Sequence, residues 1–316
     1  MTEMTYNMKH TINQTAACRE RLADMNPLCD VNYIRHLMKK YKLQFNKKYG
    51  QNFLTDEQIL NDIINASGLT PNDGALEIGP GLGTLTFALA QAAEQVVAVE
   101  IDRGLAAVLE DTLSAFDNVT ILHQDILKTD IDALVAGPFG GRAPYVVANL
   151  PYYITTPIIM GLLESGIPFP AIVVMIQKEV AQRMMASPGG KEYGVLSIAV
   201  QFYADAAICL TVPRGCFIPA PNVDSAVIRL TPRPHPTCRP KDPVLFFKAV
   251  RAAFGQRRKT LLNALSNAGC FSASKQQMEE ILRGLGMNPA ARGETLSMEQ
   301  FCLLSDALAE GQNPQK

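Results

Sequence analysis

The segment VVANLPYYIT, residues 146–155, carries groups that suit reaction at an aromatic amine. An exocyclic amine is a poor nucleophile while its lone pair is delocalised into the ring. Hydrogen-bond acceptors that hold its N–H groups favour the pyramidal, reactive nitrogen. The side-chain oxygen of Asn149 and the carbonyl of Leu150 are such acceptors. Pro151 restricts the turn, and Tyr152 can stack on the base. The segment therefore predicts methyl transfer to an aromatic amine; the alternative is a proline turn packed by tyrosines.

The segment ALEIGPGLGTLT is a candidate site for the methyl donor. Gly79, Gly81 and Gly83 lead from an apolar run into a helical pattern, which brings backbone N–H groups close to a ligand. The spacing is G-x-G-x-G rather than the G-x-G-x-x-G of dinucleotide sites, and Glu77 would repel a pyrophosphate. Because S-adenosylmethionine is cationic and lacks phosphate, this pattern favours it over NAD. A purely structural glycine turn is the alternative.

Acidic residues also follow the next two apolar runs. Glu100 comes 17 positions after Gly83, where it can accept both hydroxyls of an adenosine ribose. Asp125, in HQDIL, is placed to accept from the adenine amino group, and Ile101 and Ile126 are apolar neighbours for the ring. Taken singly, each acid fits a solvent-facing loop better. Together with the glycines they indicate one site, because ligands of open α/β sheets bind at the carboxyl ends of the strands.

These residues need a sheet that brings them to one edge. Short β-rich runs predict strands at 75–78, 95–100, 119–123, 145–148, 171–176, 206–212 and 225–230. Helical patterns between the first five lie at 82–93, 103–116, 131–135 and 156–164. Strand–helix alternation with continuously apolar strands predicts an α/β fold with a parallel sheet covered on both faces. The last two strands, separated by the turn-rich PRGCFIPAPN, predict an antiparallel hairpin at one sheet edge.

Other segments flank this sheet. Residues 31–41 and 55–66 have helical periodicity, the second with Thr55 as its cap. TPRPHPTCRPKDP, residues 231–243, contains five prolines and cannot continue a strand or helix. Beyond it, helical patterns lie at 244–253, 259–266, 274–285 and 297–309. We therefore expect an N-terminal extension over 1–44, the α/β domain over 45–232, a proline-rich linker over 233–243 and a small all-helical domain over 244–316.

The chain has 316 residues, 47% of them apolar, and a formal net charge of −1. Residues 35–48 carry +6 and residues 231–260 carry +7, which leaves −14 for the other 272 residues. A low average charge argues against a nucleic-acid partner, but two basic segments on an acidic body permit one. Solvated charge runs without a partner are the alternative for either segment.

The seven cysteines contain no CxxC pair and no metal-ligand spacing with the four histidines. We therefore expect reduced thiols, no metal and a cytoplasmic protein. The N-terminus has no apolar signal region, and no window approaches 18 consecutive apolar residues, which disfavours secretion and membrane spanning.

In combination, several motifs resemble the ribosomal RNA small-subunit adenine dimethyltransferases, which modify two adjacent adenosines near the 3′ end of 16S rRNA. The motifs are KYGQNFL, EIGPGLGTLT, VVAVEID, NLPYYIT, MIQKEVAQRM, YGVLS and FIPAPNVDSAV, and the resemblance covers about residues 45–301. It implies a Rossmann-like S-adenosylmethionine-dependent methyltransferase domain, a C-terminal helical domain and a role in assembly of the small ribosomal subunit. The first 44 residues match no motif of the family.

The resemblance also assigns roles to individual residues. The cofactor would contact Asn52, Leu54, Gly79, Gly81, Glu100, Ile101, Asp125, Ile126 and Asn149. The catalytic set would be Asn149, Leu150, Pro151, Tyr152 and Phe217. In FIPAP, Phe217 would form the second face of an aromatic clamp with Tyr152, in a loop shaped by Asn222 and Asp224; the alternative is a rigid hairpin tip.

The basic segments are expected to contact ribosomal RNA phosphates through Lys47, Lys48, Arg257, Arg258 and Lys259. The last three lie in FGQRRKTLLNAL, which we expect to begin a helix. We expect a monomer that binds 16S rRNA within an assembling small subunit.

Three other functions compete with this interpretation. A large-subunit rRNA methyltransferase of the macrolide-resistance type shares the motifs, but the FIPAP hairpin and the full-length helical domain favour the small-subunit enzyme. A non-catalytic RNA-binding factor is disfavoured by the intact acceptor and cofactor residues. A dinucleotide or small-molecule enzyme is disfavoured by the glycine spacing and by the absence of a His or Lys placed for hydride or phosphate chemistry.

Overall fold

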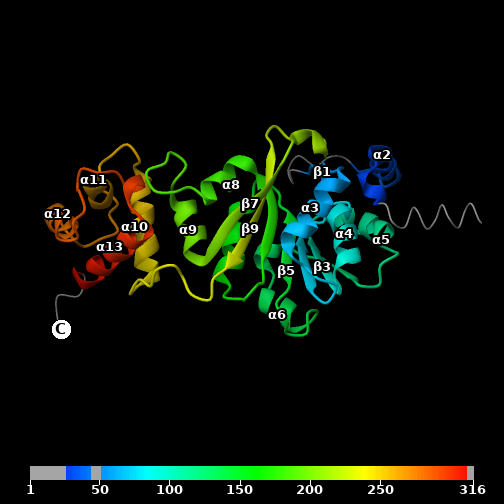
Figure 1. The fold of residues 1–316 in the computed structure, drawn as a ribbon, viewed down its shortest axis with the longest axis horizontal. Helices are drawn as coiled ribbons and strands as arrows, with labels where there is room; N and C mark the ends of the chain where they lie inside the picture. Colours follow the sequence, from blue (N-terminus) through cyan, green and yellow to red (C-terminus); the bar gives the residue numbers. More distant parts are fainter. Residues whose placement is uncertain (1–25, 44–50, 312–316) are drawn as a thin grey trace, which may run out of the picture. The chain divides into compact units, whose positions relative to one another are not determined.

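The computed structural model describes residues 26–43 and 51–311 (Figure 1). Lys47 and Lys48, two of the expected RNA contacts, lie outside the described residues. The chain divides into two compact units. The first consists of Met1–Tyr153, Val173–Met175 and Leu210–Ser225, and the second of Ile154–Ile172, Ile176–Cys209 and Ala226–Lys316. Within the described residues, no helix is long and apolar enough to cross a membrane.

A seven-stranded sheet has the order β4-β3-β2-β5-β6-β9-β7, and a separate two-stranded sheet pairs β1 with β8. The strands are β1 (Phe53–Leu54), β2 (Gly74–Ile78), β3 (Gln95–Glu100), β4 (Val119–His123), β5 (Tyr145–Asn149), β6 (Ile172–Gln177), β7 (Ala204–Val212), β8 (Phe217–Ile218) and β9 (Ser225–Pro232). β2 runs parallel to β3 and β5, and β3 runs parallel to β4. The expected α/β fold is confirmed, with the predicted strands in place to within two residues at each end.

Burial explains why the central strands form. The backbone of β3 carries Val96, Val97 and Ala98, whose side chains are all fully buried although they point to alternate faces. A strand buried on both faces must be covered by helices on both sides, which is the arrangement of a parallel α/β sheet. β7 lies at the sheet edge next to β9, and its residues alternate between more and less buried. These last two strands thus occupy the expected edge position.

The helices connect and cover the strands. Their bounds are η1 (Pro27–Cys29), α2 (Val31–Lys40), α3 (Glu57–Ser67), α4 (Thr84–Ala92), η3 (Arg103–Leu105), α5 (Ala106–Thr112), η4 (Ile126–Lys128), α6 (Ile131–Ala136), α7 (Thr155–Glu164), α8 (Lys178–Met184), α9 (Val195–Tyr203) and η5 (Arg214–Cys216). The remaining helices are α10 (Pro243–Gly255), α11 (Leu261–Ser266), α12 (Lys275–Gly284), η6 (Gly293–Thr295) and α13 (Met298–Gly311).

Several expectations about these elements were wrong. α3 is capped by Asp56, whose Oδ1 accepts from Gln58 and Ile59, whereas Thr55 bonds the carbonyl of Cys216 instead. β9 continues to Pro232, because a proline at a strand end removes only one donor. α8 and α9 were not expected. α9 is buried along most of its length and shows no polar face, so its pattern lacks the period that marks a helix.

The segment before the first family motif is an integral part of the first unit. Leu28 of η1 and Ile34 and Leu37 of α2 are fully buried in one cluster with Leu82 and Leu109. Polar contacts add to this packing, since the side chain of Asn26 donates to the carbonyl of Thr84 at 2.8 Å. α2 (dark blue in Figure 1) is therefore anchored through its apolar face.

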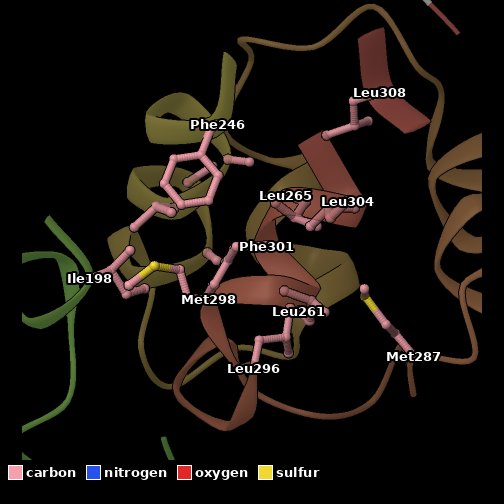
Figure 2. Packing of buried hydrophobic residues seen from close by; sticks show 14 of the residues in the cluster. Ile198, Phe246, Leu261, Leu265, Met287, Leu296, Met298, Phe301, Leu304 and Leu308 are labelled. Carbon is pink, nitrogen blue, oxygen red and sulfur yellow. The ribbon is translucent and has the colours of Figure 1, made fainter. Parts of the chain in front are cut away.

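A helical core organises the C-terminal part of the second unit. Phe246 of α10, Leu261 of α11 and Phe301 of α13 point into one apolar cluster, which Figure 2 shows from close by. α11 begins at Leu261 with Thr260 as its cap, so the expectation that Arg257, Arg258 and Lys259 open a helix was wrong. These three residues instead form the turn between α10 and α11.

Candidate methyltransferase site

The glycine segment forms a tight loop between β2 and α4. Gly79, Gly81 and Gly83 all have positive φ, at 71°, 64° and 92°, which side chains rarely adopt. At Gly83, a Cβ would also meet Leu113 at 3.3 Å and Thr112 Oγ1 at 3.2 Å. Positive φ therefore favours glycine at all three positions of this loop, and the close packing of Leu113 and Thr112 also restricts Gly83.

Glu100 ties this loop to the end of β3. Its carboxyl group is buried and accepts from the backbone N–H of Gly81 at 3.3 Å and of Asp102 at 2.8 Å. Burial raises the pKa of Glu100, while these backbone donors lower it. Each carboxyl oxygen accepts at least one backbone hydrogen bond here, and a carboxylate can accept about two per oxygen. Glu100 can therefore also accept from the hydroxyls of a ribose.

Asp125 and the two isoleucines lie at the neighbouring strand ends. Asp125 is half-buried and caps η4 through the N–H of Leu127 at 3.1 Å. Ile126 is also half-buried, whereas Ile101 is 46% exposed, which is unusual for a large apolar side chain. The side chains of Ile101 and Ile126 can therefore pack against an aromatic ring whose amino group donates to the carboxylate of Asp125.

The acceptor segment follows β5. The amide of Asn149 donates from Nδ2 to the carbonyl of Asn52 at 3.3 Å, which leaves its Oδ1 to accept from an amine. The N–H of Leu150 donates to the carbonyl of Met175 at 3.1 Å and fixes the peptide that follows Asn149. Pro151 lies against the glycine loop, since a Cβ on Gly79 would be 3.7 Å from its Cδ. The structure thus places the acceptors beside the glycine loop.

Tyr152 is held by a residue that the sequence did not reveal. Its hydroxyl is 2.7 Å from the hydroxyl of Ser225, a fully buried residue at the start of β9. Burial raises the pKa of Tyr152, so the phenol stays neutral. With its hydroxyl fixed, the ring has a defined orientation for stacking. No local signal marks Ser225, which lies 73 positions away in the chain.

The QNFL and FIPAP motifs meet in the two-stranded sheet. Phe53 pairs with Ile218 and Leu54 with Phe217, and the N–H and hydroxyl of Thr55 both donate to the carbonyl of Cys216. A Cβ on Gly81 would be 3.1 Å from the Phe53 ring, so this sheet lies directly over the glycine loop. Its position agrees with a cover for the cofactor.

Phe217 is only 5% exposed and pairs with Leu54 in the two-stranded sheet. Near it, the carboxylate of Asp224 accepts from the backbone N–H of Arg214 at 3.0 Å, whereas Asn222 is exposed. This hydrogen bond supports the loop-shaping role expected of Asp224. The clamp with Tyr152 stays a prediction.

Two further residues belong to this edge of the sheet. Glu77 is buried, and its Oε2 has no hydrogen-bond partner among the described residues. Burial raises its pKa to about 8. Asp102 accepts from the side chain of Gln51 at 3.1 Å. The motif pattern showed Glu77 as an acid, but only burial shows that it carries a proton at neutral pH.

The donor and acceptor set at this edge suits S-adenosylmethionine. Four carboxyl groups gather there, from Glu77, Glu100, Asp102 and Asp125. The buried Glu77 carries a proton and adds no charge, so the repulsion of a pyrophosphate expected from Glu77 falls to the other three. Among the described residues, only Asp125 of these four forms an ion pair, with the exposed Lys128 at 3.8 Å. A cationic molecule with hydroxyl and amino groups fits such surroundings, whereas a pyrophosphate would meet negative charge without compensation. The described residues contain no cluster of three or more potential metal ligands.

The cations expected to contact RNA differ from one another. The guanidinium of Arg257 donates to the carbonyls of Lys191 at 2.7 Å and Tyr193 at 3.2 Å, and pairs with Glu294. Arg257 therefore links the turn after α10 to two other segments of the second unit. Arg258 and Lys259 are exposed, and their side chains have no polar partner in the described part of the chain.

The chain is similar in sequence to proteins that modify ribosomal RNA. A model of the family "Ribosomal RNA adenine dimethylase" matches residues 42–310. The chain is 53% identical over 276 residues to the ribosomal RNA small subunit methyltransferase A of Geobacillus thermodenitrificans (strain NG80-2), covering 87% of this chain and 94% of that relative.

Two solved structures are also similar. A dimethyladenosine transferase from Plasmodium falciparum has a TM-score of 0.66 and 26% identity, over 79% of this chain and 95% of that chain. The 23S rRNA methyltransferase ErmE has a TM-score of 0.60 and 27% identity, over 82% of this chain and 100% of that chain. The resemblance drawn from the motifs is confirmed.

Proposed function

Because the chain belongs to the ribosomal RNA adenine dimethylase family, we propose that it dimethylates the exocyclic amino groups of two adjacent adenosines near the 3′ end of 16S rRNA. The methyl donor is S-adenosylmethionine, and the substrate is the RNA within an assembling small subunit in the cytoplasm. The chain acts as a monomer. The observation that carries the proposal is the fixed amide of Asn149, whose Nδ2 is bound to Asn52 and whose Oδ1 is left as an acceptor beside the glycine loop.

The chain's own residues hold the cofactor. Glu100 would accept from the ribose hydroxyls, the loop backbone at Gly79 would contact the methionine end, and Asp125 would accept from the adenine amino group beside Ile101. S-adenosylmethionine, when bound, supplies a methyl group on a positively charged sulfur. The sheet of Phe53–Leu54 and Phe217–Ile218 would cover the cofactor over the glycine loop.

The protein then prepares the amine. Oδ1 of Asn149 and the carbonyl of Leu150 accept its two N–H groups, which favours the pyramidal nitrogen whose lone pair can attack. Tyr152, oriented by Ser225, stacks on the adenine and keeps the nitrogen in line with the methyl group. No residue needs to act as a strong base, because the nitrogen becomes acidic once it is alkylated and can release its proton to water.

The test is methyl transfer by the purified chain from labelled S-adenosylmethionine to unmethylated small and large ribosomal subunits. We expect label in the small-subunit RNA only, recovered as N6,N6-dimethyladenosine at two adjacent positions. Asn149→Ala should abolish transfer while subunit binding is retained. Asn72→Ala, at an exposed asparagine whose side chain has no role in the site, is the control.

The large-subunit arm of this experiment addresses the strongest alternative. The similarity to ErmE, at a TM-score of 0.60, means that the fold alone does not select the subunit. Label confined to large-subunit RNA would overturn the proposal, and so would unchanged turnover in Asn149→Ala. A product that stops at one methyl group per adenosine would overturn the dimethyl specificity but leave the reaction type in place.

A further inference from the structure

A cavity of about 350 Å³ lies between α10 and α11 in the second unit. Its polar lining comes from Lys248, Arg251 and Gln256, and an apolar wall is made by Ala252, Ala264 and Ala268. All of these residues belong to the second unit, whereas the methyltransferase site lies in the first. The volume is at the lower end of the range for small-ligand sites and suits a group the size of one nucleotide.

The charge around the cavity favours an anion. Residues 244–268 contain five cations and no acid. Lys248 and Arg251 are exposed, and neither side chain has an ion pair or hydrogen bond with any residue in the described ranges. Several other cations of the same unit are paired, such as Arg283 with Glu279 and Lys241 with Glu310. Two unpaired cations that line one cavity therefore create a positive potential there that nothing nearby compensates.

The remaining lining selects among anions. Small alanine side chains leave a wall without protruding groups, against which a flat ring can lie. The amide of Gln256 offers both donors and an acceptor, which can pair with the edge of a base. A free phosphate would use only the two cations. A nucleotide uses the cations, the apolar wall and the amide together.

We propose that this cavity binds one unpaired nucleotide of the RNA substrate, with its phosphate at Lys248 and Arg251 and its base against Ala264 and Ala268. The inference rests on the proposed function and deepens it. The second unit would recognise a looped-out or single-stranded nucleotide other than the methylated adenosines. Arg258 and Lys259, in the turn that follows α10, would hold the neighbouring phosphates of the same strand.

Binding of the full chain to unmethylated small subunits, measured over a series of salt concentrations, tests this proposal. Lys248→Gln combined with Arg251→Gln should weaken binding roughly tenfold and reduce the slope of log K against log salt by about 0.7, the value for one phosphate of a single strand. Ala268→Leu, which fills the cavity and keeps the charge, should weaken binding without changing the slope. Lys275→Gln combined with Arg283→Gln, an equal charge change at exposed sites of α12, should change neither.

Cysteine reactivity gives a readout that does not depend on the ribosomal subunit. Cys270 lines the cavity and is exposed, and Cys209 on β7 is an exposed thiol that does not line it. A short single-stranded oligoribonucleotide should slow alkylation of Cys270 in the full chain at least tenfold and leave Cys209 unchanged. AMP at the same nucleotide concentration should protect far less, because it lacks the neighbouring phosphates.

Three results would overturn the inference: unchanged affinity and salt slope in the double variant, unchanged affinity in Ala268→Leu, or no protection of Cys270 by the oligoribonucleotide. Circular dichroism of each variant confirms that it is folded. If the unsubstituted chain methylates small subunits while one of these results is found, the cavity proposal fails alone. If the chain does not methylate small subunits, the proposed function fails, and the oligoribonucleotide experiment still decides about the cavity.

Discussion

Glu77 offers the sharpest test of the physical description of the site. Its carboxyl group is buried beneath the glycine loop, Oε2 lacks a partner among the described residues, and Glu100 adds like charge nearby. Burial, the largest cause, raises the pKa of Glu77 from 4.5 to about 8. In the unfolded chain the same carboxyl group titrates near its ordinary value. The folded protein therefore holds a proton on Glu77 over a pH range in which the unfolded chain has released it.

The sign and size of the effect on stability follow from this difference. A raised pKa means that the folded state binds more protons than the unfolded state between pH 4.5 and about 8. The contribution of Glu77 to stability is complete below pH 4.5 and is lost as the pH rises through about 8. Within this window the free energy of unfolding should fall by about 1.4 kcal/mol per pH unit from this group alone. Between pH 5 and pH 8 the loss amounts to roughly 4 kcal/mol.

The substitution Glu77→Gln removes the titration and keeps the shape. Urea unfolding of the substituted and unsubstituted chains, followed by circular dichroism because the chain has no tryptophan, gives their difference in stability at each pH. We expect this difference to move in favour of the variant by about 1.4 kcal/mol per pH unit between pH 5 and pH 8, whatever its absolute value. Glu110→Gln, at an exposed position of α5, should give a flat difference. A flat difference for Glu77→Gln as well would refute the conclusion that Glu77 is protonated in the folded protein.

Three other substitutions test packing and backbone. Leu37→Ala should lower stability by about 2–5 kcal/mol in urea unfolding because it opens a cavity in the buried cluster, whereas the exposed Arg35→Ala should change it by less than about 0.5 kcal/mol. Gly83→Ala should destabilise the protein by about 1–3 kcal/mol because φ at this position is 92°. Gly161→Ala, where the added Cβ meets open space, should instead raise the melting temperature. Equal effects at the two glycines would contradict this reasoning. Tyr152→Phe should cost about 1 kcal/mol of stability through the lost hydrogen bond to its buried serine partner but lower kcat/KM by no more than roughly tenfold, since the ring remains. A larger loss of activity would mean that the hydroxyl itself takes part in the reaction.

Local patterns were sufficient for most of the sheet. The strands from β2 to β5 are short runs rich in apolar residues and are followed by glycine or polar residues, so both their extent and their parallel arrangement could be predicted. Where a helix is buried on nearly all sides, as in α9, the same reasoning fails, because no polar face marks its period. Caps are also uncertain, since Asp56 and Thr55 are both good N-cap residues and a distant carbonyl at Cys216 decided between them.

By itself, the sequence determined the residue types at the proposed site: the glycines whose φ is positive, the acids at the strand ends and the Asn-Leu-Pro-Tyr acceptor segment. These are local properties, because each depends on a residue's own backbone conformation or its place at the end of a strand. The tertiary structure alone decided the pairing of Leu54 with Phe217, the anchoring of Tyr152 by Ser225 and the proton on Glu77. It also showed that the side chain of Arg257 is hydrogen-bonded within the fold, whereas those of Arg258 and Lys259 are not bonded to any residue that the structure describes. Contacts and burial of this kind join segments far apart in the chain, and no local pattern of residues encodes them.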